Sequence, residues 1–348
     1  MSFFREHIEA MEGYVPGEQP NDPSVIKLNT NENPYPPSPK ALEAIASVTG
    51  EQLRRYPQPM ADRFRDAASK VFGVDRDCVI CGNGMDDILN MTVRAFSGPE
   101  AALVYPVPTY TLYAVLAGIQ ASMVREVSWP ADYALPLDAL VAARGSVTYL
   151  ANPNAPTGTL VSIDDVAHLA EALPGVLCID EAYVDFAERD CMSIATRFDN
   201  VLVMRTMSKG YALAGIRFGF AVGHPQLIRG LMKVKDSYNV DALAIAVSSA
   251  ALLDQAYLQE TRAKVIAERT RLAAALNACG LQCLPSQANF LLARTTKPPA
   301  AALYESLKAR RILVRYFNSP GLNDALRITV GTPEQNDALI AALKDLTA

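Results

Sequence analysis

The chain has 348 residues, a formal net charge of −5, and hydrophobic side chains at half of its positions. This length is long for one hydrophobic core and natural for two. The acidic balance, without any long Lys/Arg block, argues against a nucleic-acid surface. No apolar stretch approaches about 18 residues, and the first residues lack a signal-peptide core. We therefore expect a cytoplasmic protein with neither nucleic-acid nor membrane partners.

The predicted elements begin with an irregular N-terminal arm, residues 1–37, which is rich in Pro, Asn and Gly. A helix follows from Ser38 to about Val48, with serine as the N-cap, proline in the first turn and Gly50 as the stop. Beyond it, short apolar runs alternate with helical stretches, which predicts a doubly wound, largely parallel sheet in a large domain, 38–250. The apolar runs are 78–81, 102–105, 122–127, 147–150, 176–179, 201–204 and 218–222.

The last part of the chain has a different pattern. A long helical region, 240–278, is apolar nearly all round in its first half and charged in its second, as expected for a helix that bridges two cores. Three predicted strands and a final helix capped at Thr332 and Pro333 indicate a smaller α+β domain, 251–348. The predicted fold class is therefore α/β, with a mostly parallel sheet in the large domain and a smaller C-terminal α+β domain.

Two of the six cysteines, Cys78 and Cys81, have the C-x-x-C spacing of many metal sites. They fall in a predicted buried strand, where residues three apart point to opposite faces and cannot share one ion. No second C-x-x-C pair and no nearby histidine accompany them in the sequence. We therefore expect no metal, and we interpret these cysteines as small buried residues in a reducing compartment.

Four polar segments follow predicted strands, at the edge where open α/β sheets bind ligands. They are 82–86, 152–158, Asp180 and the pair Ser208-Lys209. The first begins a helix whose free amides suit a phosphate. Each segment alone has an ordinary explanation as a turn, a cap or a surface charge, but their convergence on one edge favours a binding site.

Lys209, Asp180 and Arg217 form the set of groups that pyridoxal phosphate (PLP) needs. An amine binds the cofactor covalently, a carboxylate keeps the pyridine nitrogen protonated, and a guanidinium takes the phosphate. A nicotinamide enzyme is one alternative, but Asp87 occupies the place of the third glycine in its fingerprint. A catalytically silent PLP-binding or regulatory protein would lack Lys209 or Asp180, and both are present. The sequence therefore predicts a PLP enzyme.

Several segments resemble the histidinol-phosphate aminotransferases, class II aminotransferases with the aspartate-aminotransferase fold (fold type I). These segments are 28–35, 55–57, 152–158, 180–183, 205–217, 288–290, 314–317 and 326–332. The resemblance implies that L-histidinol phosphate and 2-oxoglutarate are converted to imidazole acetol phosphate and glutamate, a step of histidine biosynthesis. An aromatic amino-acid aminotransferase acting on phenylalanine or tyrosine, and a phosphothreonine decarboxylase, are alternatives on the same scaffold.

The resemblance also implies the roles of individual residues. Lys209 would anchor the cofactor and move the α-proton, Asp180 would pair with the pyridine nitrogen, and Tyr183 would contact the ring hydroxyl. The other cofactor-binding residues would be Met85, Asp86, Tyr110, Asn154, Ser208, Arg217 and Tyr56, of which Tyr56 would reach the neighbouring subunit of a homodimer. The substrate-binding residues would be Tyr14, Asn33, Tyr238, Asn239, Arg315 and Arg327.

One position departs from the family pattern. The family often has two asparagines before Pro-Thr-Gly, and the second contacts the ring hydroxyl; here that position is Ala155. Either Asn154 shifts to serve in its place, or Tyr183 acts with less help.

Overall fold

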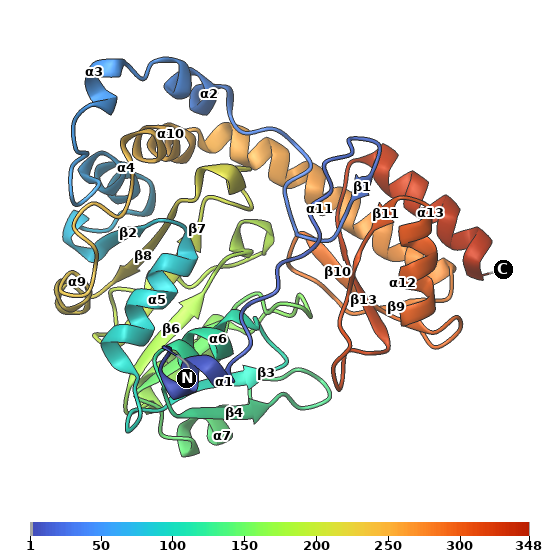
Figure 1. Ribbon diagram of the computed structural model, residues 1–348, viewed down its shortest axis with the longest axis horizontal. Coiled ribbons are helices and arrows are strands. Elements are labelled where there is room, and N and C mark those ends of the chain that lie inside the picture. The colour runs from blue at the N-terminus through green and yellow to red at the C-terminus, as the bar shows by residue number, and fades with distance from the viewer. Residues whose placement is uncertain (1–2, 348) are drawn as a thin grey trace.

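The computed structural model describes residues 3–347 and shows two packed bodies joined by a long helix (Figure 1). A seven-stranded sheet in the order β2-β8-β7-β6-β5-β3-β4 forms the centre of the larger body. Its strands are β2 (Val79–Gly82), β3 (Leu103–Val107), β4 (Val124–Ser128), β5 (Val147–Ala151), β6 (Val176–Asp180), β7 (Val201–Thr206) and β8 (Gly219–Gly223). β8 runs antiparallel to the other six strands. The prediction of an α/β fold with a mostly parallel sheet is confirmed.

Helices cover both faces of this sheet, and the strands show why. Val201 and Val203 of β7 enter one hydrophobic core, whereas Leu202 and Met204 enter the other. Both sets of alternating side chains are therefore buried, so the strand needs a continuous apolar run rather than an alternating one. The covering helices are α4 (Asp62–Phe72), α5 (Met85–Phe96), α6 (Leu112–Ile119), α7 (Leu137–Ala142), α8 (Ile163–Ala172), α9 (Pro225–Leu231) and α10 (Ala242–Leu253).

Several predicted element boundaries differ from the observed ones, and three have a clear local cause. Cys78 belongs to a 3₁₀ turn, Arg76–Cys78, so β2 begins at Val79. The first long helix, α2 (Pro39–Ala46), ends earlier than expected, and Gly50 begins α3 (Gly50–Leu53) instead of stopping α2. A capping box at Thr49, whose side chain accepts from the Gln52 amide while Gln52 contacts the Thr49 amide, starts this extra turn.

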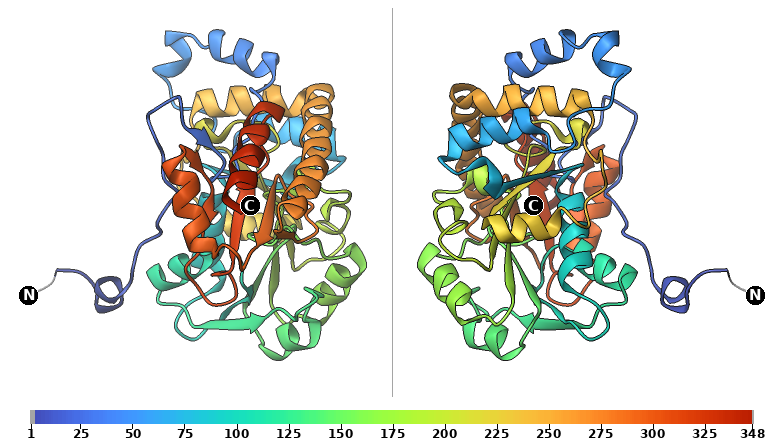
Figure 2. Two further views of the ribbon diagram at one scale, coloured as in Figure 1. Left: turned by 90° about the vertical axis from the view of Figure 1, so that its right-hand side faces the viewer. Right: turned by 90° about the vertical axis from the view of Figure 1, so that its left-hand side faces the viewer.

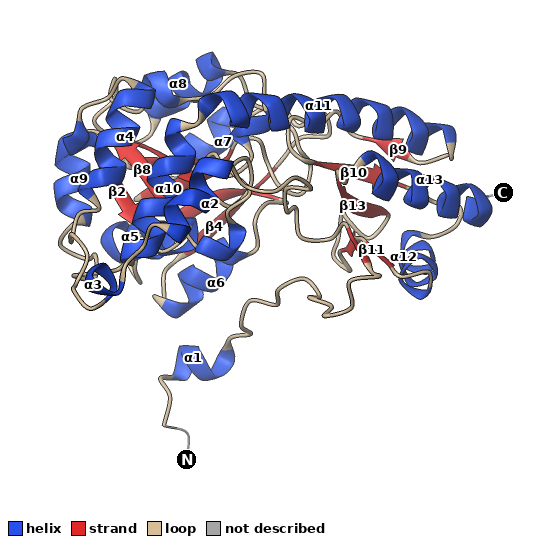
Figure 3. Cartoon of the chain, turned by 90° about the horizontal axis from the view of Figure 1, so that it is seen from above, coloured by secondary structure: helices blue, strands red, loops and turns tan. Residues whose placement is uncertain are grey.

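The predicted helical region 240–278 is two helices, because the chain breaks at Asp254. The Asp254 backbone leaves the helical range, and its carboxylate accepts hydrogen bonds from Ser38 Oγ at 2.5 Å and Lys40 Nζ at 2.9 Å. These contacts tie the break to the start of α2. The second helix, α11 (Gln255–Ala278), runs from the larger body along the smaller one (Figure 3).

The smaller body contains the antiparallel sheet β12-β13-β10-β9 and helices that pack on it. Its elements are β9 (Gln282–Cys283), β10 (Phe290–Arg294), α12 (Ala300–Ala309), β11 (Ile312–Leu313), β12 (Arg315–Tyr316), β13 (Ala325–Thr329) and α13 (Pro333–Thr347). The second half of α11 contributes Val265, Leu272 and Leu276 to the core of this body. The division at residues 250 and 251 stays a prediction, since α11 contacts both cores.

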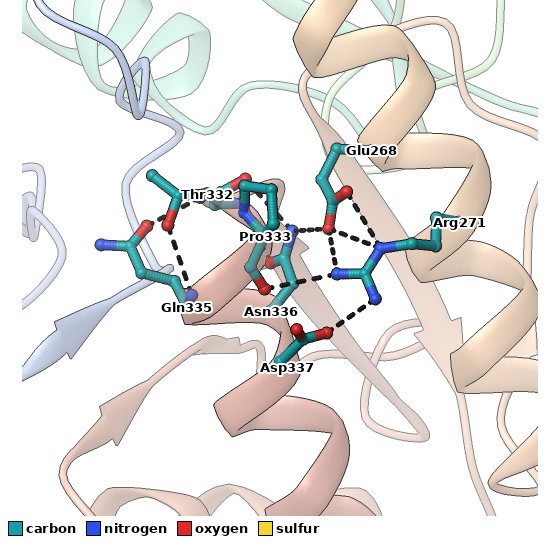
Figure 4. A network of polar contacts seen from close by, with 8 residues as sticks. Glu268, Arg271, Thr332, Pro333, Gln335, Asn336 and Asp337 are labelled. Carbon is teal, nitrogen blue, oxygen red and sulfur yellow. Dashed lines mark hydrogen bonds and ion pairs between the residues drawn. The ribbon is translucent and has the colours of Figure 1, made fainter.

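A polar network fixes the final helix to α11 (Figure 4). Asn336, which is fully buried, donates to Glu268 at 2.9 Å and bonds both ways with the backbone of Gly331. Arg271 binds the same Glu268 and also Asp337 at 2.6 Å. Because Gly331 lies two residues after the end of β13, this network holds the end of the strand that carries Arg327.

The N-terminal arm touches both bodies. Helix α1 (Glu6–Ala10) packs near α6, where Arg5 donates to the Ile119 carbonyl at 3.4 Å. Strand β1 (Ile26–Lys27) instead pairs in parallel with β11 of the smaller body. The segment between them runs as an extended chain along the outside of the molecule (Figure 2). Within residues 3–347, no helix is both long and apolar enough to span a membrane.

Candidate active site

A cavity of about 350 Å³ lies at the carboxyl ends of the parallel strands, where the arm and the smaller body meet the large sheet. The end of β6 supplies Asp180, and the loop after β7 supplies Ser208 and Lys209. Eleven of the predicted site residues line this cavity: Tyr14, Met85, Asp86, Tyr110, Asp180, Tyr183, Ser208, Lys209, Arg217, Arg315 and Arg327. The expected convergence of separate segments on one edge of the sheet is therefore observed.

Lys209 presents its amine to the cavity. Lys209 Nζ donates to the Thr30 carbonyl oxygen at 3.1 Å and lies 5.9 Å from the centre of the Tyr183 ring. Burial, reinforced by the positive charge of Arg327, lowers the pKa of Lys209 to about 8. At pH 7 about a tenth of this amine is therefore neutral and nucleophilic, far more than for an ordinary lysine.

Asp180 is a buried carboxyl group held by two donors. Tyr113 Oη donates to Asp180 Oδ2 at 2.5 Å, and the Ala182 amide donates to Oδ1 at 3.0 Å. Burial raises the pKa of Asp180 to about 6, although both hydrogen bonds oppose the increase. The group is mainly ionised at pH 7, and its remaining acceptor capacity faces the cavity and suits a cationic N–H.

The start of α5 and Arg217 form a second polar end of the cavity. The first amides of a helix have no partner within the helix, and they favour anions. Arg217 Nη1 donates to Ser208 Oγ at 3.3 Å, and Nη2 pairs with Asp86 at 3.3 Å. Gly84 has a φ of +80°, and a Cβ there would lie 2.7 Å from Arg217 Nη2. The positive φ favours glycine here, and any side chain would displace the guanidinium from its place beside the helix start.

Arg315 and Arg327 lie opposite each other on the antiparallel strands β12 and β13. Arg327 Nη2 donates to the Asn29 carbonyl at 2.9 Å, whereas its Nε is buried without a hydrogen-bond partner. Burial lowers the pKa of Arg327, and the charge of Arg315 adds to this effect. Arg315 has one long contact, from Nη2 to the Val15 carbonyl at 3.4 Å. Two cations without a carboxylate partner within 4.0 Å, among the described residues, form a site for anions.

Aromatic side chains border the space between these polar ends. Tyr110 lies edge-on to Tyr14 from the arm, with ring centres 6.0 Å apart, and its hydroxyl donates to Asp86 at 3.4 Å. Burial raises the pKa of Tyr110, so this phenol stays protonated. Tyr183 packs edge-on against Phe290 with ring centres 4.9 Å apart.

Five predicted site residues lie outside the cavity lining of their own chain. Asn154 is fully engaged elsewhere, since its amide donates to Pro108 and Thr157 and accepts from Thr109. In the structure Asn154 therefore does not take the place of the amide missing at Ala155, and its role in cofactor binding stays a prediction.

Asn33 and Asn239 do not line this cavity in the structure, and their roles in substrate binding stay predictions. Asn33 Nδ2 donates to the backbone carbonyls of Lys209 and Gly210, both at 3.0 Å, so it holds the loop that carries the lysine. Asn239 Nδ2 donates to the Cys81 carbonyl and to Asp87. Both side chains are thus committed to the protein itself.

The remaining two residues, Tyr56 and Tyr238, stack on each other at the surface. Their ring centres are 4.5 Å apart, and Tyr56 is 81% exposed. Neither lines the cavity of its own chain.

Three further residues of the site were not predicted: Tyr113, Thr30 and Asn31, which contact Asp180, Lys209 and Tyr183 respectively. Tyr113 follows Tyr110 by three residues, close to one helical turn, and this spacing was a usable signal. Nothing local in the sequence shows that Thr30 and Asn31 reach residues about 150 or more positions away. Among residues 3–347, no group of three or more His, Cys, Asp or Glu side chains could hold a metal ion.

Comparisons with known proteins agree on one family. The family described as aminotransferase class I and II matches residues 23–343. The chain is 54% identical to histidinol-phosphate aminotransferase 1 of a Nostoc species, covering 99% of this chain and 98% of the relative. It is 44% identical to histidinol-phosphate aminotransferase of Citrifermentans bemidjiense, covering 99% of both. The crystal structure of histidinol-phosphate aminotransferase from Sinorhizobium meliloti in complex with pyridoxal-5'-phosphate matches with a TM-score of 0.91 at 27% identity, covering 100% of this chain and 98% of that one.

Proposed function

Because the chain belongs to the histidinol-phosphate aminotransferase family, within the class I and II aminotransferases, we propose that it is a PLP-dependent histidinol-phosphate transaminase. It exchanges the amino group of L-histidinol phosphate for the oxo group of 2-oxoglutarate, giving imidazole acetol phosphate and glutamate. One observation carries this proposal. The Lys209 amine, with its lowered pKa, and the buried carboxylate of Asp180 face one cavity, which is also lined by two arginines without a carboxylate partner among the described residues. The similar proteins are histidinol-phosphate aminotransferases, so the alternative of an aromatic amino-acid aminotransferase is not favoured.

The residues of the cavity fit the cofactor. Glycine at position 84 leaves space beside the free amides of Met85 and Asp86, where Arg217 and Ser208 supply further donors for a phosphate. Asp180 supplies a carboxylate for the pyridinium N–H, and Tyr110 supplies an aromatic face. The carboxylate of Asp86 opposes an anion there, but its pairing with Arg217 offsets this charge.

When bound, PLP supplies an electron-withdrawing pyridinium ring that accepts the electron pair released at the substrate Cα. Asp180 keeps the ring nitrogen protonated, because a carboxylate beside an N–H⁺ stabilises the charged form. Lys209 would hold the cofactor through Nζ. With this amine free and neutral, Lys209 would take the proton from the substrate Cα and return it on the far side of the substrate nitrogen.

Arg315 and Arg327 explain how one pocket accepts two different substrates. Glutamate has two carboxylates, whereas histidinol phosphate has a phosphate and no carboxylate. We assign the α-carboxylate of glutamate to Arg327, whose buried Nε is the unpaired donor of a bidentate fork. Arg315, with Tyr14 beside the cavity, binds the phosphate of histidinol phosphate or the second carboxylate of glutamate.

The active unit in this proposal is a homodimer with shared sites. Tyr56 and Tyr238 form an exposed aromatic pair that has no function within its own chain, and Leu53 and Leu253 are exposed apolar side chains as well. Tyr56 would contact the cofactor phosphate of the partner subunit. The six cysteines are all free thiols, which supports a location in the reducing cytoplasm.

Borohydride reduction tests the cofactor assignment. The purified protein should be yellow, and reduction should fix the cofactor to Lys209, as read by peptide mass spectrometry. Lys235, whose pKa is also lowered by burial, is the matched control lysine outside the cavity. A label on Lys235, or no label at all, would contradict the proposal.

A further inference from the structure

The hydroxyl of Tyr183 receives a hydrogen bond from the N-terminal arm. Asn31 Nδ2 donates to Tyr183 Oη at 3.0 Å, and both residues line the cavity. Asn31 is only 1% exposed, so bulk water does not compete for this contact. The arm therefore reaches a side chain of the active site directly.

The surroundings of Asn31 determine which way its amide points. Thr329 Oγ1 accepts from the Asn31 backbone N–H at 3.0 Å and lies 3.1 Å from Asn31 Oδ1. In the structure the single hydroxyl proton of Thr329 goes to Asn31 Oδ1, which leaves Nδ2 facing Tyr183. Asn289 also donates to the Asn31 carbonyl at 3.0 Å. The residue has a φ of +56°, a conformation that asparagine adopts more readily than most residues.

This contact leaves the Tyr183 proton available. Because Tyr183 Oη accepts from Asn31, its own O–H is free to donate to an acceptor in the cavity. Burial raises the pKa of Tyr183, so the phenol keeps that proton at neutral pH. Ala155 has no amide to offer the ring hydroxyl, and the neighbouring Asn154 is engaged with Pro108, Thr109 and Thr157.

We propose that Asn31 is a positioning residue that compensates for Ala155: it orients the Tyr183 hydroxyl so that this group donates to the ring oxygen of the bound cofactor. The inference rests on the proposed PLP function. A donor at that oxygen stabilises its ionised form, so it lowers the pH at which the lysine-bound cofactor gives up its proton. Asn31 acts only through Tyr183, and its effect should vanish when the Tyr183 hydroxyl is removed.

The test is a pH titration of the visible absorption band of the holoenzyme. Asn31→Gly removes the amide while tolerating the positive φ. The titration midpoint of the visible band in Asn31→Gly should be about 1 pH unit higher than in the wild type. This is the size expected when a hydrogen bond to an ionised group is lost. Tyr183→Phe should raise the midpoint at least as far, and adding Asn31→Gly to Tyr183→Phe should change it no further.

Asn31→Asp provides a second variant should Asn31→Gly fail to fold. It keeps the side-chain shape and the oxygen that Thr329 contacts, but it replaces the donating NH₂ by an acceptor, so the midpoint should again rise. An unchanged midpoint in the variant that folds, or shifts of Asn31→Gly and Tyr183→Phe that simply add, would overturn the role of Asn31. A wild-type protein without any visible band would refute the cofactor assignment and this inference together.

Discussion

Replacing Arg315 should separate the phosphate-bearing substrate from aromatic amino acids. Among residues 3–347, no carboxylate lies within 4.0 Å of Arg315, and its one long hydrogen bond goes to the Val15 carbonyl. Its charge is therefore available to a ligand. Arg315→Ala would leave a dianionic phosphate without a charge-assisted partner, a loss of about 2–4 kcal/mol. This corresponds to a kcat/KM for histidinol phosphate that is about 30- to 1000-fold lower.

The assay compares steady-state kcat/KM for histidinol phosphate and phenylalanine in each variant. Phenylalanine has no second anion, so its kcat/KM should change little. Arg315→Lys keeps the charge but loses the planar fork. Its kcat/KM for histidinol phosphate should lie between those of the wild type and Arg315→Ala. Arg310→Ala removes an exposed arginine that pairs with Asp345 at 3.0 Å and serves as the control. Equal losses with both substrates, or no loss with either, would refute the assignment of the phosphate to Arg315.

The remaining predictions concern the catalytic groups and the dimer. Asp180→Asn should abolish most turnover yet stabilise the cofactor-free protein at pH 7. The folded-state pKa of Asp180 is raised from 3.8 to about 6, so ionising it destabilises the fold as pH rises through that window, by about 3 kcal/mol once complete. Denaturant unfolding and kcat measure both effects, and near-native turnover would mean that another acid holds the ring nitrogen. The rate of acylation of Lys209 in the cofactor-free protein, measured by mass spectrometry, should increase about tenfold per pH unit and level off near pH 8. A rate that keeps increasing to pH 10 would contradict the lowered pKa. Mixing Tyr56→Ala with Lys209→Ala subunits should restore part of the lost activity through hybrid dimers, and no rescue after proven subunit exchange would count against shared sites.

Much of the fold was predictable from the sequence, because buried parallel strands leave continuous apolar runs. Each such run in the larger body became a strand, and the polar residues after 147–150, 176–179 and 201–204 met at one edge. Asp180 and Lys209 could thus be placed in one site, because the direction of parallel strands determines where their ends lie.

The parts that could not be predicted depend on contacts between distant segments. The helix break at Asp254 arises from its bonds to Ser38 and Lys40, which no local pattern shows. The hydrogen bond from Asn31 to Tyr183 likewise depends on the path of the N-terminal arm, whose sequence has no hydrophobic periodicity from which a path could be predicted. The contacts of Asn33 and Asn239 with the backbone carbonyls of Lys209 and Cys81 also join segments that are far apart in the sequence.

The central claim is that this chain transaminates histidinol phosphate, and the ratio of two specificity constants tests it most directly. With 2-oxoglutarate as amino acceptor, kcat/KM for L-histidinol phosphate should exceed that for phenylalanine by at least about 30-fold, the lower bound for one charge-assisted phosphate contact. A kcat/KM for phenylalanine or tyrosine that equals or exceeds the value for histidinol phosphate would contradict the account.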